Sequence, residues 1–150
     1  MTKGEIAREY FKSGYACSQA VALAFKEYTG LTEEQIASAT LGFGGGLGRL
    51  RLTCGAVSGM AYIAGIVFSN GENSGENKLK VYEHVRNLAK AFTDEFGCLI
   101  CEDLLKGVGL TVEKGGNPEK RTDEYYKKRP CDEIVMVSAE ILDKYIKENK

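Results

Sequence analysis

The sequence predicts an all-α protein, a compact single-domain helical bundle of about six helices around a central apolar helix rich in Gly and Ala. Three observations support this prediction. Apolar residues recur at helical spacing in several segments, and no segment alternates apolar and polar residues as a half-buried strand would. Residues 52–71 carry no charged side chain, which is typical of a buried helix. The 150 residues suit one domain, residues 1–150, whose core needs no disulfide bonds.

The first three helices are expected in the first third of the chain. Residues 2–13 place apolar side chains on one helical stripe, and Gly14 is suited to end that helix. The alanine-rich segment 16–29 favours a second helix. Thr32 and Gln35 have the spacing of a capping box, which predicts that Thr32 is the N-cap of a third helix.

A glycine-rich run at residues 42–48 separates the third helix from the central one. Five glycines in these seven residues exclude regular structure. The central helix is expected to begin after Cys54. Its small residues, among them Gly55 and Gly59, would let the backbone of a neighbouring helix approach closely. This approach is expected within the chain.

The second half of the chain is expected to form two long helices, over residues 76–96 and from Cys131 onward. Between them, residues 98–105 are expected to form a short helix or a helical turn, and the polar residues 107–129 to hold at best one short helix near 119–126. The residues expected on the buried faces of the long helices are Val81, Tyr82, Val85, Leu88, Ala89 and Phe92 on the first, and Ile134, Val137, Ile141 and Tyr145 on the last.

The charge balance and the apolar segments exclude several classes of function. Twenty basic and twenty-one acidic residues give a net charge of −1, which offers no basic surface for nucleic acid. The N-terminal residues lack the apolar core of a secretory signal, and the apolar part of residues 52–71 is shorter than the roughly 20 residues that span a membrane. We therefore expect a cytoplasmic protein with no membrane partner. In a reducing compartment, five cysteines favour metal binding or redox chemistry over structural disulfides.

The cysteines are placed at predicted helix starts. Cys17, Cys54 and Cys131 lie in or just before the first turn of a helix, and Cys98 and Cys101 lie at the start of a short one. The unpaired N–H groups and partial positive charge at a helix start stabilise a thiolate, which is the form that binds metal and acts as a nucleophile. The alternative is that each cysteine is a small buried apolar residue.

Several segments resemble a known family, in order along nearly the whole chain. They are residues 14–21 around Cys17, the run 43–49, the motif Cys54-Gly55-Ala56-Val57-Ser58-Gly59, and Cys101 and Cys131 with the residues that follow them. The chain is similar to the small redox-active proteins named for a C…CGAxxG…C…C pattern. The resemblance implies that Cys17, Cys54, Cys101 and Cys131 are the functional sulfurs. Cys98 departs from the pattern and forms C-x-x-C with Cys101.

The first mechanism open to these sulfurs is metal ligation for electron transfer to a redox partner protein. Four thiolates, from Cys17, Cys54, Cys101 and Cys131, suit an iron–sulfur cluster or a structural zinc. Their wide spacing is unlike the close pairs of zinc ribbons and favours iron–sulfur over zinc. The residues expected to approach such a cofactor with backbone N–H groups or positive charge are Gly44, Gly45, Gly46, Arg49, Arg51 and Gly55.

The second mechanism is thiol–disulfide exchange, in which one cysteine attacks and a neighbour resolves. Cys98 with Cys101, with Cys98 as the resolving thiol, and Cys54 with Cys17 are candidate pairs. No βαβ pattern accompanies the C-x-x-C pair, so thioredoxin-like chemistry is not indicated. A third interpretation is a non-catalytic helical module that binds a partner or forms a homodimer through its small-residue helix face.

Other cofactors and reactions lack the residues they need. No His follows Cys98-x-x-Cys101, so covalent haem attachment is not predicted. The glycine run fits neither the dinucleotide-binding pattern nor a phosphate-binding loop, which excludes a nucleotide motif. The single histidine, His84, has no companion ligand and supports no Ser–His–Asp hydrolase, so we interpret it as structural.

Overall fold

The computed structural model describes all of residues Met1–Lys150 and confirms the all-α fold class. In chain order the helices are α1 (Lys3–Lys12), α2 (Cys17–Leu23), α3 (Glu33–Thr40), α4 (Gly55–Phe68), α5 (Gly75–Phe96), α6 (Cys101–Lys106), α7 (Asp123–Lys128) and α8 (Cys131–Asn149), with 3₁₀ turns η1 (Lys26–Tyr28) and η2 (Leu41–Phe43) on either side of α3. There are eight α-helices rather than about six because α6 and α7, with six residues each, are helices in their own right.

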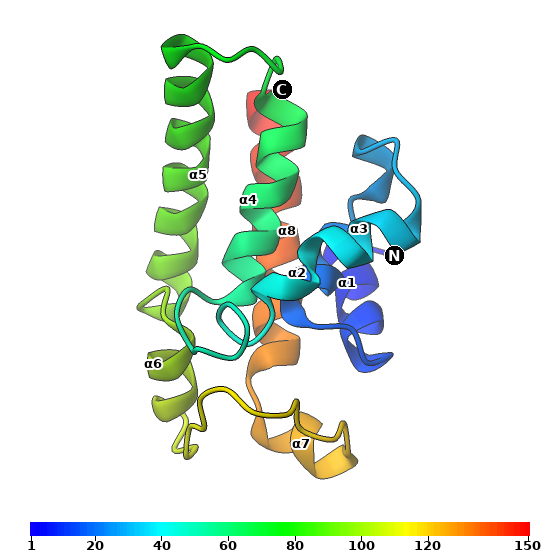
Figure 1. The fold of residues 1–150 in the computed structure, drawn as a ribbon, viewed down its shortest axis with the longest axis vertical. Helices are drawn as coiled ribbons and strands as arrows, with labels where there is room; N and C mark the ends of the chain where they lie inside the picture. The colour runs from blue at the N-terminus through cyan, green and yellow to red at the C-terminus, as the bar shows by residue number, and fades with distance from the viewer.

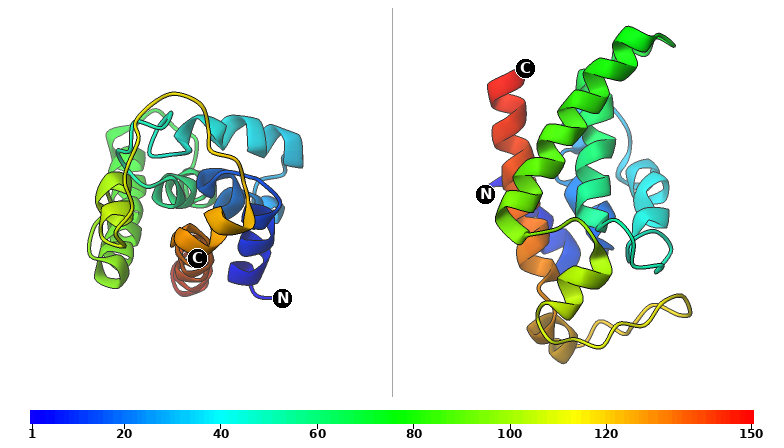
Figure 2. Two further views of the ribbon diagram at one scale, coloured as in Figure 1. Left: turned by 90° about the horizontal axis from the view of Figure 1, so that it is seen from below. Right: turned by 90° about the vertical axis from the view of Figure 1, so that its left-hand side faces the viewer.

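The long helices α4, α5 and α8 run along the longest axis of the molecule (Figure 1). Helices α1, α2 and α3 pack on one side of them, and α6, α7 and the segment that joins these two lie at one end. Figure 2 shows that this joining segment, residues 107–122, arches from α6 across to α7. The glycine-rich turn before α4 lies at the same end of the bundle (Figure 1).

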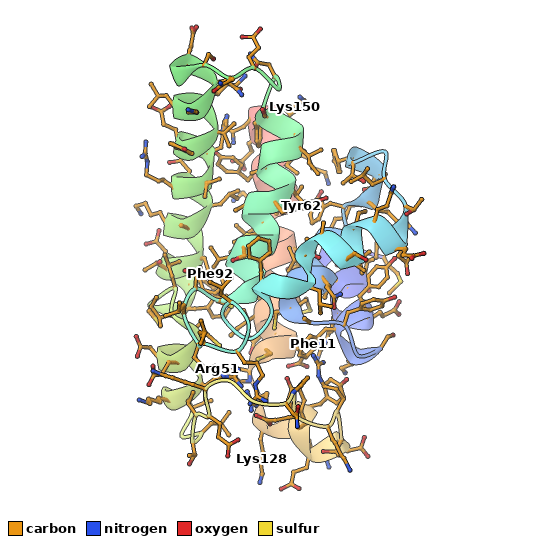
Figure 3. The ribbon with its side chains drawn as sticks, in the orientation of Figure 1. Phe11, Arg51, Tyr62, Phe92, Lys128 and Lys150 are labelled. Carbon is orange, nitrogen blue, oxygen red and sulfur yellow. The ribbon has the colours of Figure 1, made fainter.

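Helix α4 is the centre of the bundle, as predicted. It packs against α2, α5 and α8, and its residues Ala56, Met60, Ile63 and Ala64 are fully buried. Side chains such as that of Phe92, which is also fully buried, fill the space between the helices (Figure 3). No helix combines the length and the apolar character that crossing a bilayer requires.

Capping residues in the sequence predicted most of the helix ends correctly. Thr32 and Gln35 form the expected capping box, with the Thr32 hydroxyl accepting from the Gln35 N–H at 3.1 Å and the Gln35 side chain accepting from the Thr32 N–H at 3.0 Å. Gly97 ends α5 in a left-handed conformation with φ 90°. The second helix is shorter than expected, because α2 ends at Leu23 and the chain continues into η1.

The buried faces of the long helices differ in part from those predicted. On α5, Leu88 and Phe92 are buried but Tyr82 is 56% exposed, because this outer helix packs only against α4 and α8. On α8, the buried residues are Ile134, Val135, Ser138, Ala139, Leu142 and Ile146. Of the predicted residues only Ile134 is buried, whereas Val137, Ile141 and Tyr145 are half-buried. The buried face is shifted because α8 also packs closely against α1.

Candidate cysteine site

Four of the five cysteines line one cavity of about 70 Å³ at the end of the bundle where α6 and α7 lie. Cys17, Cys101 and Cys131 are the first residues of α2, α6 and α8, and Cys54 is the N-cap of α4. All of them are free thiols. The predicted helix-start positions of these four cysteines are therefore confirmed, and the fold brings the four helix starts together around one space.

Two glycines of α4 bring the starts of α2 and α4 into contact. A Cβ atom at Gly59 would lie 2.8 Å from the carbonyl oxygen of Ser18, and one at Gly55 would lie 3.2 Å from the Ser18 nitrogen. Only a glycine permits this approach, which places Cys17 beside Cys54. The close approach expected from the small residues of α4 is thus made within the chain.

Backbone hydrogen bonds fix Cys54 next to Cys101. The Cys54 N–H donates to the carbonyl oxygen of Leu99 at 2.8 Å, and the Cys101 N–H donates to that of Leu52 at 2.6 Å. Between them, Thr53 and Ile100 form an isolated antiparallel bridge. The start of α4 and the start of α6 are therefore held together independently of side-chain packing.

Cys17 and Cys131 both line this cavity, and their side chains interact. Hydrogen bonding between the two thiols is the main cause that lowers the pKa of Cys131, and it raises the pKa of Cys17 well above its ordinary value. The guanidinium groups of Arg129, Arg121 and Arg51 lower the Cys131 pKa further, while burial opposes the shift. Of the two sulfurs, Cys131 is therefore the one that loses its proton more readily, and Cys17 is the one that keeps it.

The other two thiols of the cavity hold their protons more tightly. Burial raises the pKa of Cys54 to about 12, although the backbone N–H groups of Ala56 and Val57 favour its thiolate. Burial also raises the pKa of Cys101, against a hydrogen bond from the Arg51 guanidinium to its sulfur at 3.7 Å. The expectation that a helix start lowers the thiol pKa is therefore wrong for these cysteines, since desolvation outweighs the helix dipole.

The glycine-rich turn supplies one wall of the cavity through an uncommon backbone conformation. Gly45, Gly46, Leu47, Gly48, Arg49 and Arg51 all have positive φ. At Gly46, a Cβ atom would lie 2.6 Å from the Leu52 nitrogen, so no other residue fits there. A non-glycine residue with a left-handed backbone costs about 1 kcal/mol or more of conformational free energy. Residues strained in this way tend to cluster at functional sites.

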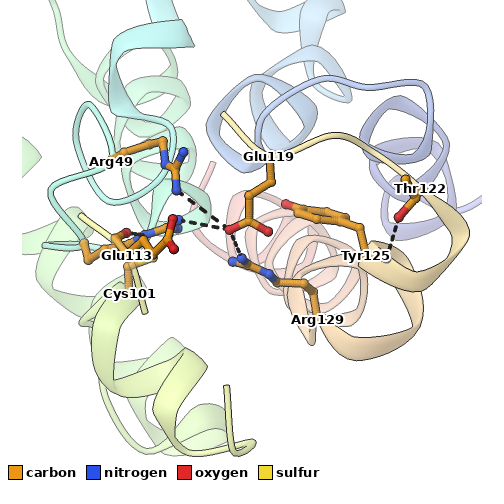
Figure 4. A network of polar contacts seen from close by, with 8 residues as sticks. Arg49, Cys101, Glu113, Glu119, Thr122, Tyr125 and Arg129 are labelled. Carbon is orange, nitrogen blue, oxygen red and sulfur yellow. Dashed lines mark hydrogen bonds and ion pairs between the residues drawn. The ribbon is translucent and has the colours of Figure 1, made fainter. Parts of the chain in front are cut away.

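A network of arginines surrounds the thiol pair on the side of the 107–122 segment. Glu119 forms ion pairs with Arg49 at 3.7 Å and with Arg51 at 3.8 Å, and it also contacts Arg129 (Figure 4). Arg51 also donates from Nε to the carbonyl oxygen of Glu113 at 3.0 Å, which ties the turn to the segment. The site is therefore strongly basic although the whole chain is nearly neutral.

Tyr125 closes the cavity between two of these arginines. The guanidinium carbons of Arg121 and Arg129 lie 4.9 and 5.1 Å from the centre of its ring. Burial raises the pKa of Tyr125 to about 12, and the charge of Cys131 adds to this shift. The phenol therefore stays protonated beside the thiolate.

The predicted cofactor-binding residues fall on two adjoining cavities. Gly45, Gly46 and Gly55 line the cysteine cavity, and Gly44 and Arg49 line a neighbouring cavity of about 320 Å³ that Gly45 also borders. Cys98 lines neither of them, because it precedes α6 and packs against the hydrophobic core.

The sequence analysis missed Arg121, Tyr125 and Arg129, which line both cavities. No local pattern identifies them, because Arg121 lies before α7 and Arg129 is its C-cap, so the three do not share one helix face.

The metal-binding interpretation depends on how closely the sulfurs converge. The donor chemistry fits a thiolate-ligated metal, since four cysteines line one cavity. However, no three His, Cys, Asp or Glu side chains lie close enough together to hold a metal ion. Ligation by these four cysteines would therefore require their helix starts to move.

Comparison with known proteins gave one match. Residues 15–145 match a family model described as "Putative redox-active protein (C_GCAxxG_C_C)". In this chain Cys54 precedes Gly55, whereas the name writes Gly before Cys. The close contacts of Gly55 with α2 account for glycine at the second position here. No curated protein and no solved structure matched.

Proposed function

Because the chain belongs to the C_GCAxxG_C_C family of redox-active proteins, we propose that it carries out two-electron thiol–disulfide exchange through Cys17 and Cys131. The observation that carries this proposal is that both thiols line one cavity with three arginines, where their interaction lowers the pKa of Cys131 and raises that of Cys17. One sulfur is thus prepared to attack as a thiolate, and the other is held beside it to resolve the intermediate.

The proposed reaction oxidises the protein and reduces a partner disulfide. The Cys131 thiolate attacks one partner sulfur, so a Cys131–partner bond forms and the partner S–S bond breaks, leaving a partner thiolate. Cys17 gives its proton to that thiolate, its sulfur attacks the Cys131 sulfur, and the second partner sulfur leaves as a thiolate. The protein has lost two electrons and one proton, and the partner ends as one thiol and one thiolate.

The surrounding residues have defined roles in this scheme. Arg129, Arg121 and Arg51 stabilise the attacking thiolate by charge. Cys54, with a pKa of about 12, stays protonated at neutral pH and does not compete as a nucleophile. Cys98 lies outside the cavity and has no part in the exchange.

Thiol counting tests this proposal directly. Under mild oxidation by a small disulfide, the reduced protein should lose two of its five thiols and regain them on reduction. Cys131→Ser should abolish this loss, and Cys17→Ser should reduce it to the one thiol held in a mixed disulfide, whereas the matched control Cys98→Ser should still lose two. Iodoacetamide at neutral pH should label Cys131 first, as peptide mass spectrometry would show. An unchanged thiol count in wild type, or an unchanged loss in Cys17→Ser, would rule the pair out.

A second candidate is ligation of an iron–sulfur cluster, or less favourably zinc, by Cys17, Cys54, Cys101 and Cys131. The observation in its favour is that all four line one cavity with the backbone of Gly45 and Gly46. A bound cluster would supply one-electron transfer. Anaerobic purification followed by an absorption spectrum and quantification of iron, sulfide and zinc separates the candidates. Stoichiometric iron and sulfide would favour the cluster, and metal-free protein with a reversible two-thiol couple would favour the exchange.

A further inference from the structure

The larger cavity, of about 320 Å³, adjoins the cysteine cavity and shares several lining residues with it. The shared residues are Ala16, Gly45, Arg51, Arg121, Tyr125 and Arg129. Its size falls at the lower end of the range of about 300–1,000 Å³ found for small-molecule sites. A molecule held there would lie directly beside the thiol pair.

The wall of this cavity carries an excess of buried positive charge. Four arginines line it, and Glu119 is its only acidic residue. The side chains of Arg49, Arg51 and Arg129 are only 13%, 7% and 9% exposed, while that of Glu119 is 39% exposed. Burying guanidinium groups with too few anions is costly, so a cavity of this kind favours a bound anion.

The arginines differ in how many of their donors the protein already uses. Arg121 donates to the carbonyl oxygens of Phe11 and Tyr15, which anchors the segment before α7 to the end of α1. Arg51 donates to the Glu113 carbonyl oxygen and to the Cys101 sulfur. By contrast, Nε and Nη2 of Arg49 are buried and have no hydrogen-bond partner. Arg49 thus presents unused donors of the kind that bind a carboxylate or phosphate side-on.

Glu119 is placed as an internal substitute for such an anion. Its carboxylate lies among Arg49, Arg51 and Arg129, at ion-pair distances that are long for the first two (Figure 4). The Glu119 side chain is 39% exposed and belongs to the 107–122 segment rather than to a helix, so it can turn toward solvent without a shift of any helix. A carboxylate from outside the protein can therefore compete with it for the same guanidinium groups.

We propose that this cavity binds a small molecule bearing an oxyanion group, a carboxylate or a phosphate, through Arg49, Arg51 and Arg129. The ligand takes the position of the Glu119 carboxylate, and Arg49 donates to it from Nε and Nη2. This inference goes beyond the thiol–disulfide function, because binding requires the arginines and no cysteine. It also names the chemical class of molecule that the site holds next to the thiol pair.

The experiment is a calorimetric titration of reduced protein, at low ionic strength, with inorganic phosphate and separately with succinate. Glu119→Gln should bind about tenfold more tightly than wild type, because the competing carboxylate is lost. Arg49→Met should bind at least about tenfold more weakly, and Arg49→Lys should lie between the two. The controls are Glu72→Gln and Arg86→Met, which make the same chemical changes at exposed positions away from the cavity.

Each outcome has a defined meaning. Phosphate binding without succinate binding supports a phosphate-bearing ligand, and the reverse supports a carboxylate-bearing one. The proposal is overturned if neither probe binds wild type or Glu119→Gln, or if Arg49→Lys and a folded Arg49→Met bind as wild type does. The double variant Cys17→Ser/Cys131→Ser should retain binding, so loss of the redox couple and loss of the anion site are distinguishable.

Discussion

Leu47, Arg49 and Arg51 share a left-handed backbone conformation that few non-glycine residues adopt, with φ of 73°, 61° and 60°. For the two arginines, the conformation places guanidinium groups on the wall of a cavity. Leu47 lines neither cavity and its side chain is 46% exposed. The left-handed backbone at Leu47 therefore places no side chain in either cavity.

Replacing Leu47 with glycine should stabilise the protein. The left-handed conformation destabilises the folded state by about 1–2 kcal/mol for a residue with a Cβ atom. Glycine removes this strain, but its greater freedom in the unfolded chain opposes the gain by about 0.5–1 kcal/mol. We expect Leu47→Gly to raise the free energy of unfolding by about 0.5–1 kcal/mol, measured by urea denaturation. The control Leu79→Gly, at an exposed position within α5, should lower it by about 1 kcal/mol. Equal destabilisation by both substitutions would contradict the strain assignment.

At the scale of elements, the site depends on the contact between α2 and α4. A Cβ atom at Gly59 would lie 2.8 Å from the Ser18 carbonyl oxygen and 3.1 Å from the Val21 Cβ atom. Because both neighbours belong to α2, any larger residue must push the two helices apart. Cys17 lies one residue before Ser18, so the thiol pair moves with α2.

Gly59→Ala should therefore be destabilising and should slow formation of the disulfide. Overpacking of this kind costs about 1–3 kcal/mol. The control is Gly65→Ala in the same helix, where an added Cβ atom meets nothing within 4 Å. There alanine should raise stability by about 1 kcal/mol through helix propensity. Urea denaturation and the rate of thiol loss measure both effects, and destabilisation by both variants would show that the α2 contact is not the cause.

Across the whole molecule, the three long helices are joined by an aromatic cluster away from the cysteines. His84 of α5 stacks on Phe68 of α4 with ring centres 3.8 Å apart, and its Nδ1 lies 2.7 Å from the hydroxyl of Tyr145 on α8. Asn87 donates to the same hydroxyl at 3.1 Å, which leaves the Tyr145 proton available for donation to Nδ1 of a neutral imidazole. The interpretation of His84 as a structural residue accounts for these contacts.

Burial, with a smaller contribution from Lys80, lowers the pKa of His84, and Glu83 opposes this shift. A histidine whose pKa is lower in the folded state binds fewer protons there than in the unfolded chain. Its contribution to stability is complete above the unfolded pKa of about 6.5 and decreases as the pH falls through that value.

The free energy of unfolding of the wild type should fall between about pH 7.5 and pH 5.5, a window that spans the histidine pKa. Because His84 is the only histidine, His84→Gln should show a smaller decrease over this range. Urea denaturation of reduced protein at the two pH values measures the difference. Parallel decreases in both proteins would assign the pH dependence to other groups.

The sequence predicted the ends of the helices better than it predicted which residues form the site. The capping box at Thr32, the helix stop at Gly97 and the start of α4 after Cys54 depend on neighbouring residues, and all were predicted correctly. The pairing of Cys17 with Cys131 depends on how α2 and α8 pack, which no local pattern reports. Spacing in the chain instead suggested Cys98 with Cys101, and Cys98 lies outside the cavity.

The arginine-lined cavity was the least predictable part. Arg49 and Arg51 were expected near the sulfurs because they adjoin the glycine run. Arg121 and Arg129 reach the cavity only because the 107–122 segment is held by long-range hydrogen bonds, such as the one from the Gly115 N–H to the Arg49 carbonyl oxygen at 2.8 Å. Such contacts follow from the completed fold and leave no periodic pattern in the chain.

The positions of the four cavity cysteines, 17, 54, 101 and 131, have a consequence for biosynthesis. Translation delivers Cys131 last, after Arg121, and the thiol pair exists only when α8 packs against α1 and α2. Until then every thiol of the nascent chain keeps an ordinary pKa near about 8.5. Under the proposed exchange, reactivity toward disulfides is thus acquired at the final stage of folding, and an incomplete chain on the ribosome has no activated thiolate to be trapped by an oxidant.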